Sequence, residues 1–197
     1  MTINHEKKLI FIHIPKNAGT SITKAMGSEN ICIDGTIEDY KKNYVDYWNQ
    51  YKKFTVVRDP IDRFISAYKF ARMNESTWFS ITGRDDLDKH PHYNICNSVD
   101  INGYVSYLYE NPQEFNIWTY NQTYFLTNKE RKTEIDYCLR YENLNQDLKS
   151  IGIHNIERNN VSKIKIEDEH LLKLSKKSKK ILHEIYYIDY KNFLYSM

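Results

Sequence analysis

The sequence is poor in the residues that build disulfide frameworks, membrane spans and flexible linkers. Its 197 residues include only three cysteines, four prolines and six glycines. Cys32, Cys96 and Cys138 form no CxxC pair, which favours buried free thiols in a reducing compartment over disulfides or a zinc site. No apolar run reaches the roughly 20 residues of a membrane helix, and no signal peptide opens the chain, so we expect a cytoplasmic protein without a membrane span.

An excess of charge of one sign is also missing. The formal net charge is +2, which argues against a dedicated nucleic-acid binder. The basic run KLSKKSKK at 173–180 fits a solvated helix face better than a nucleic-acid patch. A hydrophobic content of 41% supports a real core, and 17 tyrosines favour a polar-rimmed interior or an aromatic-lined cleft. We therefore expect one domain over residues 1–197.

One segment near the N-terminus has the pattern of an anion-binding loop. The apolar stretch Leu9 to Ile14 is followed by PKNAGTS at 15–21 and then by helical spacing, which predicts a strand, a tight loop and a helix start. The amides and dipole of a helix N-terminus attract phosphate. Gly19 lets the backbone approach the ligand, and Lys16 adds a positive charge. The GxxxxGK[ST] order is missing, so a P-loop kinase is the weaker alternative.

A second segment ends a strand in a similar way. Phe54 to Val57 is continuously apolar and rich in β-branched residues, as expected of a strand buried on both faces of a parallel sheet. It leads into Arg58-Asp59-Pro60, where Asp59 can cap a helix and Pro60 can occupy its first turn. Ligands of parallel sheets bind at the carboxyl ends of strands, so one ligand can touch both Lys16 and Arg58.

The rest of the chain alternates between strand-like and helix-like patterns. The region Ala71–Asn97 is polar, rich in Asp and His and without clear periodicity, and we expect a long functional loop there. A third strand is expected at Ile135–Arg140. This alternation predicts an α/β domain with a mainly parallel sheet. Helices are expected from Thr36 to about Tyr51, from Ile61 to Lys69, from Ser98 to Tyr109, from the third strand to Ile151, and from Glu167 to about Phe193 as one helix or a pair.

The two loop segments together resemble a known pair of motifs. HIPKNAGTS at 13–21 matches H-x-P-K-[TN]-x-G-[TS]-[ST], and VRDPIDRFISAY at 57–68 matches V-R-[DN]-P-x-x-R-x-x-S-x-Y. These are similar to the cofactor signatures of sulfotransferases that use 3′-phosphoadenosine-5′-phosphosulfate (PAPS), in the carbohydrate branch. Weaker similarity continues in LRYENL at 139–144 and YYIDYKNF at 186–193. The resemblance implies a P-loop-containing, three-layer α/β/α fold with a mainly parallel central sheet.

The resemblance also implies roles for individual residues. PAPS would serve as co-substrate, with no metal, and a carbohydrate hydroxyl would accept the sulfuryl group. Arg63 either contacts the cofactor or pairs with Asp59 four residues earlier. Arg58 and Ser66 would hold the 3′-phosphate. The implied contacts to the 5′-phosphosulfate come from the first motif, namely from Lys16, Gly19, Thr20 and Ser21, with Asn17 as a further cofactor-binding residue.

Catalysis needs a group that takes the proton of the acceptor hydroxyl, while Lys16 neutralises the leaving phosphate. Related enzymes carry the base, often His or Glu, between the two motifs, but residues 23–53 contain no histidine. Asp34 is the first candidate, and a turn residue before a capped helix is the alternative interpretation. His90 and His92 are the second candidates and can also line the acceptor cleft. A solvated loop is their alternative interpretation.

The acceptor and the number of subunits are not defined by the sequence. Acceptor specificity is expected in the loop 71–97 and around Trp118, with Trp78 and Phe79 as loop aromatics that suit a sugar. Tyr104 and Tyr107 have helical spacing and are expected in the core. The missing histidine leaves a different function open, a non-catalytic module that binds a nucleotide or a glycan.

Overall fold

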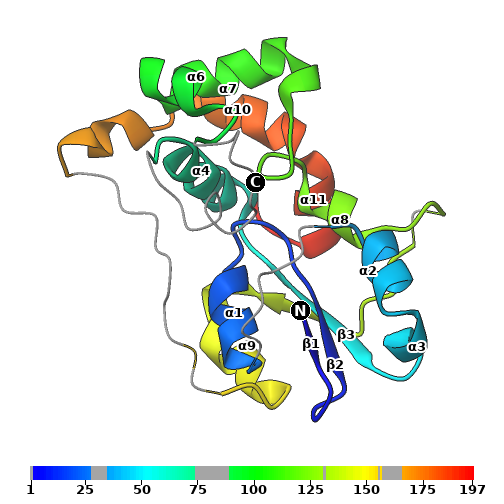
Figure 1. Cartoon of the computed structure of the whole chain (residues 1–197). Helices are drawn as coiled ribbons and strands as arrows, with labels where there is room; N and C mark the ends of the chain where they lie inside the picture. Colours follow the sequence, from blue (N-terminus) through cyan, green and yellow to red (C-terminus); the bar gives the residue numbers. More distant parts are fainter. Residues whose placement is uncertain (1, 28–34, 74–88, 131, 155, 157–165) are drawn as a thin grey trace. The chain divides into compact units, whose positions relative to one another are not determined.

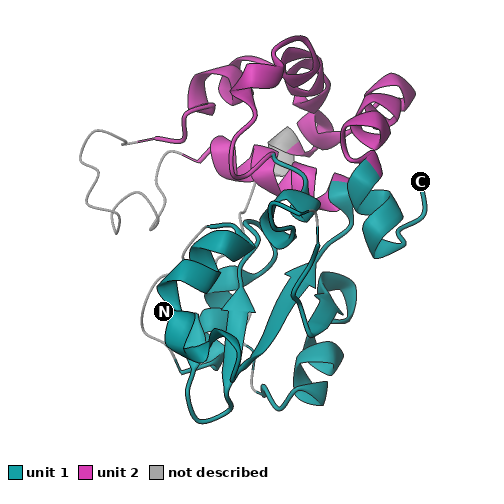
Figure 2. Cartoon of the chain, turned by 90° about the vertical axis from the view of Figure 1, so that its right-hand side faces the viewer, with its two compact units in different colours: residues 1–60, 120–161, 188–197 teal, residues 61–119, 162–187 magenta. Residues whose placement is uncertain are grey.

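The chain divides into two compact units, each made of several segments. Unit 1 comprises residues 1–60, 120–161 and 188–197, and unit 2 comprises residues 61–119 and 162–187 (Figure 2). The expectation of one domain over residues 1–197 stays a prediction. The computed structural model describes residues 2–27, 35–73, 89–130, 132–154, 156 and 166–197 (Figure 1).

A four-stranded sheet forms the centre of unit 1. Its strands, in spatial order, are β1 (Ile3–Asn4), β2 (Leu9–Ile12), β3 (Lys52–Val57) and β4 (Tyr137–Arg140). β1 is antiparallel to β2, whereas β2, β3 and β4 are parallel to one another. The expected α/β class is confirmed, and the third predicted strand begins two residues later than expected. The carboxyl ends of the three parallel strands therefore meet at one edge of the sheet.

Helices cover both faces of this sheet (Figure 1). α1 (Gly19–Ala25) and α9 (Leu144–Ser150) lie on one side of the strands, and α2 (Ile37–Asn43) and α3 (Val45–Trp48) lie on the other. The core under α1 and α9 is apolar because alternate residues of the strands face it. Its buried members are Leu9, Phe11, Ile22, Met26, Phe54, Val56, Leu139, Leu148 and Ile153.

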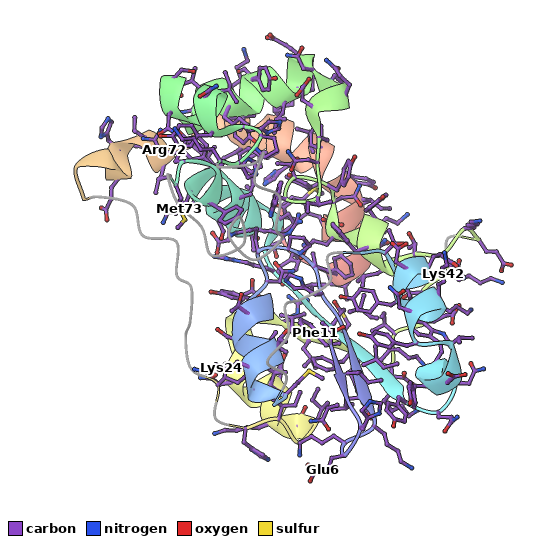
Figure 3. All side chains as sticks on the ribbon, viewed as in Figure 1. Glu6, Phe11, Lys24, Lys42, Arg72 and Met73 are labelled. Atoms are coloured by element: carbon purple, nitrogen blue, oxygen red, sulfur yellow. The ribbon has the colours of Figure 1, made fainter. Side chains whose placement is uncertain are left out.

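The two central strands are buried because their apolar residues follow one another without a break. Every residue of β2 and the last four residues of β3 are buried. Phe11 stacks on Phe54 with ring centroids 5.0 Å apart. Figure 3 shows Phe11 inside unit 1, whereas Lys24 extends outward from α1. The apolar runs thus predicted the buried strands correctly.

The polar helix expected from Thr36 to about Tyr51 is interrupted. It ends at Asn43 and a separate short helix, α3, begins at Val45. Its predicted start is confirmed, because the Thr36 hydroxyl accepts from the Asp39 N–H (3.4 Å) and the Asp39 carboxylate accepts from the Thr36 N–H (2.8 Å). This reciprocal capping box fixes where the chain enters α2.

Three further elements complete unit 1. A 3-10 turn, η2 (Tyr141–Asn143), joins β4 to α9, and α11 (Tyr187–Phe193) lies near the end of the chain. The short helix α8 (Gln122–Leu126) was not predicted, although its N-cap Asn121 accepts a hydrogen bond from the Tyr124 N–H. Five residues are too few to show a helical repeat in the sequence.

The described part of unit 2 is helical. α4 begins at Pro60, as predicted, and continues to Ala71. The region Ala71–Asn97 was predicted to be a loop, but its last part forms α6, so that prediction was wrong for 93–97. The helix that was expected from Ser98 begins at Ile101. The further elements are α6 (Tyr93–Ser98), α7 (Ile101–Glu110), η1 (Pro112–Glu114), η3 (Ile166–Leu172) and α10 (Lys176–Ile185).

Tyrosines hold unit 2 together through both rings and hydroxyls. Phe64 and Tyr104 stack with centroids 5.5 Å apart, and Tyr104 is 1% exposed. The hydroxyl of Tyr186 donates to the Thr119 carbonyl at 2.8 Å. The expectation that Tyr104 belongs to the core is confirmed. The numerous tyrosines therefore contribute apolar area while their hydroxyls remain hydrogen-bonded.

The cysteines follow the expectation only in part. Cys96 is a buried free thiol, whereas Cys138 is free but exposed on β4, so its predicted burial was wrong. Cys32 lies outside the described residues. Across the described ranges, no helix is both long and apolar enough to cross a membrane.

Candidate active site

The loop between β2 and α1 contains two non-glycine residues with left-handed backbone angles. Lys16 has φ of 73° and Ala18 has φ of 62°. Each such residue costs about 1–2 kcal/mol, so surrounding contacts must hold the loop in this shape. Left-handed residues in a tight turn are typical of backbone nests, in which successive N–H groups face an anion. Ala18 is also the N-cap of α1 and provides no side-chain cap.

Gly19 and His13 pack against each other within this loop. A β-carbon at position 19 would lie 2.0 Å from Nε2 of His13, which is too close for any side chain. His13 is 8% exposed, and its backbone N–H donates to the Tyr40 hydroxyl at 3.1 Å. The motif predicts that Gly19 lets the backbone approach a ligand. The structure shows a second requirement, which is room for the imidazole.

Asn17 joins the loop to the end of β3. Its side chain is fully buried, and Nδ2 donates to the Val56 carbonyl and to Gln122 Oε1, each at 2.8 Å. Its Oδ1 is buried and has no hydrogen-bond partner in the described part of the chain. The amide nitrogen thus fixes the loop, while the oxygen remains available as an acceptor.

Arg58 follows β3 and reaches back to the first loop. Its Nη1 donates to the carbonyl of Lys16 at 3.3 Å, and its guanidinium carbon lies 4.2 Å from the centre of the Tyr141 ring. The buried Nε has no hydrogen-bond partner among the described residues. Stacking on an aromatic ring holds a guanidinium in a fixed plane while its edge can bind oxyanions. This contact brings the two loops together, whereas the prediction that one ligand touches both loops stays a prediction.

The segment after β4 supports the second loop. Glu142 Oε1 accepts from the backbone N–H of Asp59 at 2.8 Å, and Glu142 Oε2 accepts from the Tyr195 hydroxyl at 2.9 Å. Burial, together with the neighbouring carboxylate of Glu142, raises the pKa of Tyr195, so its phenol keeps the proton that it donates. Three strand ends are therefore connected at this edge of the sheet, and each has a cationic side chain at or just after its last residue, namely Lys16, Arg58 and Arg140.

Comparison with known proteins identifies the family. A family model described as "Sulfotransferase family" matches residues 1–196, which is almost the whole chain. The chain belongs to the sulfotransferase family. Neither the curated proteins nor the solved structures gave a match.

The predicted cofactor residues of this sulfotransferase are divided between the two units. Thr20 is exposed at the start of α1, whereas Ser21 is 5% exposed. Ser66 is half-buried on α4 in unit 2, and its predicted contact with the 3′-phosphate stays a prediction. The residues that unit 1 brings together on two adjoining loops are Lys16, Asn17, Gly19, Thr20, Ser21 and Arg58.

The candidate bases His90 and His92 belong to unit 2 and not to these loops. Asp34 is outside the described residues. His90 and His92 are 3% and 5% exposed, so the solvated-loop interpretation was wrong for both. The ring of His90 lies 4.4 Å from that of Trp118, measured between centroids, and its Nδ1 accepts from the His92 N–H at 2.9 Å. These contacts make Nδ1 of His90 an acceptor, which requires a ring without a proton on that atom.

His92 lies in a polar cluster within unit 2. Its Nδ1 is 2.8 Å from the Tyr104 hydroxyl, and its Nε2 is 3.7 Å from the carboxylate of Glu114. Burial lowers the pKa of His92, and Glu114 opposes that shift only partly. Burial also raises the pKa of Tyr104, so the phenol remains protonated. A neutral His92 has the protonation state of a base, and its role as the base stays a prediction.

Several supporting residues were not recognised as site residues from the sequence. Gln122 bonds both to Asn17 and to the backbone of Arg58, and Tyr141 stacks on Arg58. Tyr141 lay within the weaker LRYENL similarity, whereas Gln122 had only the N-cap Asn121 beside it as a signal. Arg63 is 2% exposed and donates to the Ile117 carbonyl at 3.4 Å, while its predicted pairing with Asp59 stays a prediction. Among the described residues, no three metal-binding side chains gather.

Proposed function

We propose that this sulfotransferase moves the sulfuryl group of PAPS to a hydroxyl of a carbohydrate. The observation that carries the proposal is the hydrogen bond between Arg58 Nη1 and the Lys16 carbonyl, which joins two cationic loops at adjacent strand ends. The helices on both faces of the sheet support the three-layer α/β/α form of the fold.

The chemistry of these loops fits the anionic groups of PAPS. Lys16 lies in a left-handed turn of the kind that forms anion nests, and the hydroxyls of Thr20 and Ser21 follow on the same helix start. Arg58 has a buried Nε donor with no partner among the described residues, which is unusual for a native structure unless a ligand supplies the acceptor. In the proposal, the first loop holds the 5′-phosphosulfate, and Arg58 with Ser66 holds the 3′-phosphate.

Sulfuryl transfer in this proposal is an in-line displacement. The acceptor oxygen forms a bond to sulfur while the bond between sulfur and the 5′-phosphate oxygen breaks, and the hydroxyl proton passes to a base. The Lys16 ammonium neutralises negative charge on the departing phosphate, and the loops hold the reactants in the orientation that in-line displacement needs. PAPS supplies the activated sulfuryl group, so the protein contributes positioning, charge and a proton acceptor.

The base remains one of three proposed residues, namely Asp34, His90 and His92. Asp34→Asn keeps the shape of the side chain and removes its basicity. If Asp34 is the base, kcat should fall by roughly 10²–10⁴-fold while the affinity for the bisphosphate product stays unchanged. Unchanged kcat would exclude Asp34 and direct the same test to His90→Gln and His92→Gln.

The cofactor assignment is tested by calorimetry with 3′-phosphoadenosine-5′-phosphate, with ATP as control. Selective binding of the bisphosphate supports the proposal, whereas preference for ATP, or binding of neither nucleotide, contradicts it. Arg58→Lys tests the 3′-phosphate contact, because an ammonium does not replace a planar guanidinium. It should weaken the bisphosphate by about tenfold or more and leave adenosine 5′-phosphate almost unaffected.

The carbohydrate acceptor needs a separate test. The protein is incubated with PAPS labelled in the sulfuryl group and with a panel of neutral and acidic saccharides. Transfer of label to a saccharide supports the acceptor class. Selective bisphosphate binding without transfer to any acceptor would instead favour the non-catalytic module.

A further inference from the structure

A buried glutamine outside both signature motifs connects the two loops. Gln122 is the first residue of α8 and is 0% exposed. Its Oε1 accepts from Asn17 Nδ2 at 2.8 Å and from the Arg58 N–H at 2.9 Å, while its Nε2 donates to the Arg58 carbonyl at 2.8 Å. One side chain thus contacts the first loop through Asn17 and the second through Arg58.

This set of hydrogen bonds requires a side chain that carries both an acceptor and a donor. Gln122 bonds to both the N–H and the C=O of Arg58, as a neighbouring strand would do, and so pairs with the residue directly after β3. A carboxylate lacks the donor, and a hydrocarbon lacks both groups. Because the amide is fully buried, water cannot replace these bonds, and loss of any of them leaves a polar group unpaired.

Gln122 is itself held in place by Asp189 of α11. The Asp189 carboxylate accepts from the Gln122 N–H at 2.6 Å and from the N–H and hydroxyl of Thr123, each at 2.8 Å. Asp189 is 0% exposed, and its carboxyl group lies at the N-terminus of α8, where the first backbone N–H groups have no partner within the helix. The glutamine side chain therefore projects from a fixed backbone.

We propose that Gln122 is a positioning residue for sulfuryl transfer. It acts through Asn17 and Arg58 and sets the spacing between the first loop, which presents Lys16, and the second loop, which presents Arg58. This inference rests on the proposed function for the identity of the ligand. The geometry on which it depends lies entirely within unit 1.

Gln122→Glu is the most informative variant. It keeps the shape of the side chain and makes the hydrogen bond to the Arg58 carbonyl depend on pH. The ionised carboxylate accepts from Asn17 and from the Arg58 N–H but faces the Arg58 carbonyl without a proton. The protonated acid regains a donor. The affinity for the bisphosphate, relative to wild type at the same pH, should be lower by roughly tenfold or more at pH 8 and should recover as the pH falls towards 5.5. Dividing the affinity of the variant by that of wild type at the same pH cancels the effect of protonation of the ligand itself.

Two further variants separate positioning from stability. Gln122→Met has a similar volume and no hydrogen-bonding amide, so its affinity should be low at every pH. Tyr44→Phe is the matched control, because it removes a buried hydrogen bond to the Thr2 N–H in the same unit without touching either loop. The inference requires that Tyr44→Phe lowers the melting temperature without changing bisphosphate affinity. It is overturned if Gln122→Glu binds like wild type at every pH, or if affinity follows melting temperature across all variants.

Amide hydrogen exchange of the free protein tests whether Gln122 positions the two loops, even if the bisphosphate is not the ligand. In Gln122→Met, the amides of Arg58 and of residues 16–19 should exchange faster than in wild type, whereas Tyr44→Phe should leave them unchanged. Unchanged exchange of residues 16–19 in Gln122→Met would show that Gln122 does not position the first loop. Absence of bisphosphate binding by wild type, with altered exchange in Gln122→Met, would reject the proposed cofactor and retain the positioning role.

Discussion

The imidazole of His13 occupies the space in which any other residue at position 19 would place its β-carbon. Gly19→Ala would bring that carbon within 2.0 Å of Nε2 of His13, so the loop or the ring must move. We expect a loss of about 1–3 kcal/mol in the free energy of unfolding, as for other overpacked sites. We also expect bisphosphate binding to weaken strongly, because Lys16 lies in the displaced loop. Urea denaturation and calorimetry measure the two effects.

Gly27→Ala is the matched control for this substitution. Gly27 has φ of 71°, and within the described part of the chain nothing lies within 4 Å of a β-carbon at this position, so alanine there costs backbone strain without a collision among those residues. It should destabilise the protein by about 1–2 kcal/mol and leave bisphosphate affinity unchanged. Equal weakening of binding by both variants would show that general destabilisation, and not the contact with His13, controls the loop.

At the scale of elements, α10 begins in a way that is unfavourable for a helix. Its first turn contains Lys176 and Lys177 and no acidic residue, although the positive end of the helix dipole disfavours cations there. Lys176→Glu should therefore raise the free energy of unfolding by about 0.3–1 kcal/mol at low ionic strength, with the gain reduced by salt. Lys129→Glu makes the same change of net charge on an exposed loop residue. An equal gain from both would attribute the effect to net charge.

The burial of His92 near α6 makes stability depend on pH. Its pKa is lowered from 6.5 by burial, with the Glu114 carboxylate as the opposing group and Tyr104 as the hydrogen-bond partner. Below pH 6.5 the unfolded chain takes up the proton first, so this contribution to stability is lost as the pH falls towards the lowered pKa of the folded state. His92→Gln should flatten the fall in urea midpoint between pH 7 and pH 5.5. His154→Gln removes an exposed histidine, and equal flattening by both variants would contradict the role of burial.

Local sequence patterns predicted the elements whose signals are local. The apolar runs of β2 and β3, the capping box at Thr36 and the helix start at Pro60 each depend on neighbouring residues, and all were found. The helix α8 was missed because it has only five residues and because part of its N-terminus is fixed by Asp189, 67 residues away. The helix α6 was missed for a similar reason, since polar residues such as His92 become buried only through distant aromatic partners.

The candidate site shows the same division. The two motifs could be recognised in the sequence because each combines the end of an apolar strand with a loop of characteristic composition. In the structure, a hydrogen bond between Arg58 and the Lys16 carbonyl joins the two loops. The role of Gln122 could not be predicted from the sequence. Its hydrogen bonds to Asn17 and Arg58 span 105 and 64 positions, and such distant contacts produce no periodic pattern in the sequence. A residue that acts through backbone contacts has no characteristic spacing in the sequence.

At the scale of the whole molecule, unit 1 is assembled from three separate segments of the chain. The network around Gln122 draws on all three, with Asn17 and Arg58 from the first segment, Gln122 from the second and Asp189 from the third. Removal of either loop, α8 or α11 would therefore break the same network. The candidate site depends on the closure of unit 1 and not on the two motifs alone.

Amide hydrogen exchange of the protein, measured with and without the bisphosphate product, tests whether the candidate site depends on the network around Gln122. Ligand bound at the two loops should slow exchange in residues 13–21 and 57–66, and the network should carry weaker protection to α8 and to Asp189. At 100 times Kd the ligand should also stabilise the folded protein by about 2.7 kcal/mol. Arg58→Lys provides the control, because at equal ligand concentration it should reduce protection in all these segments together. Protection confined to residues 89–119, with none in 13–21, would place the nucleotide elsewhere and contradict the proposed site.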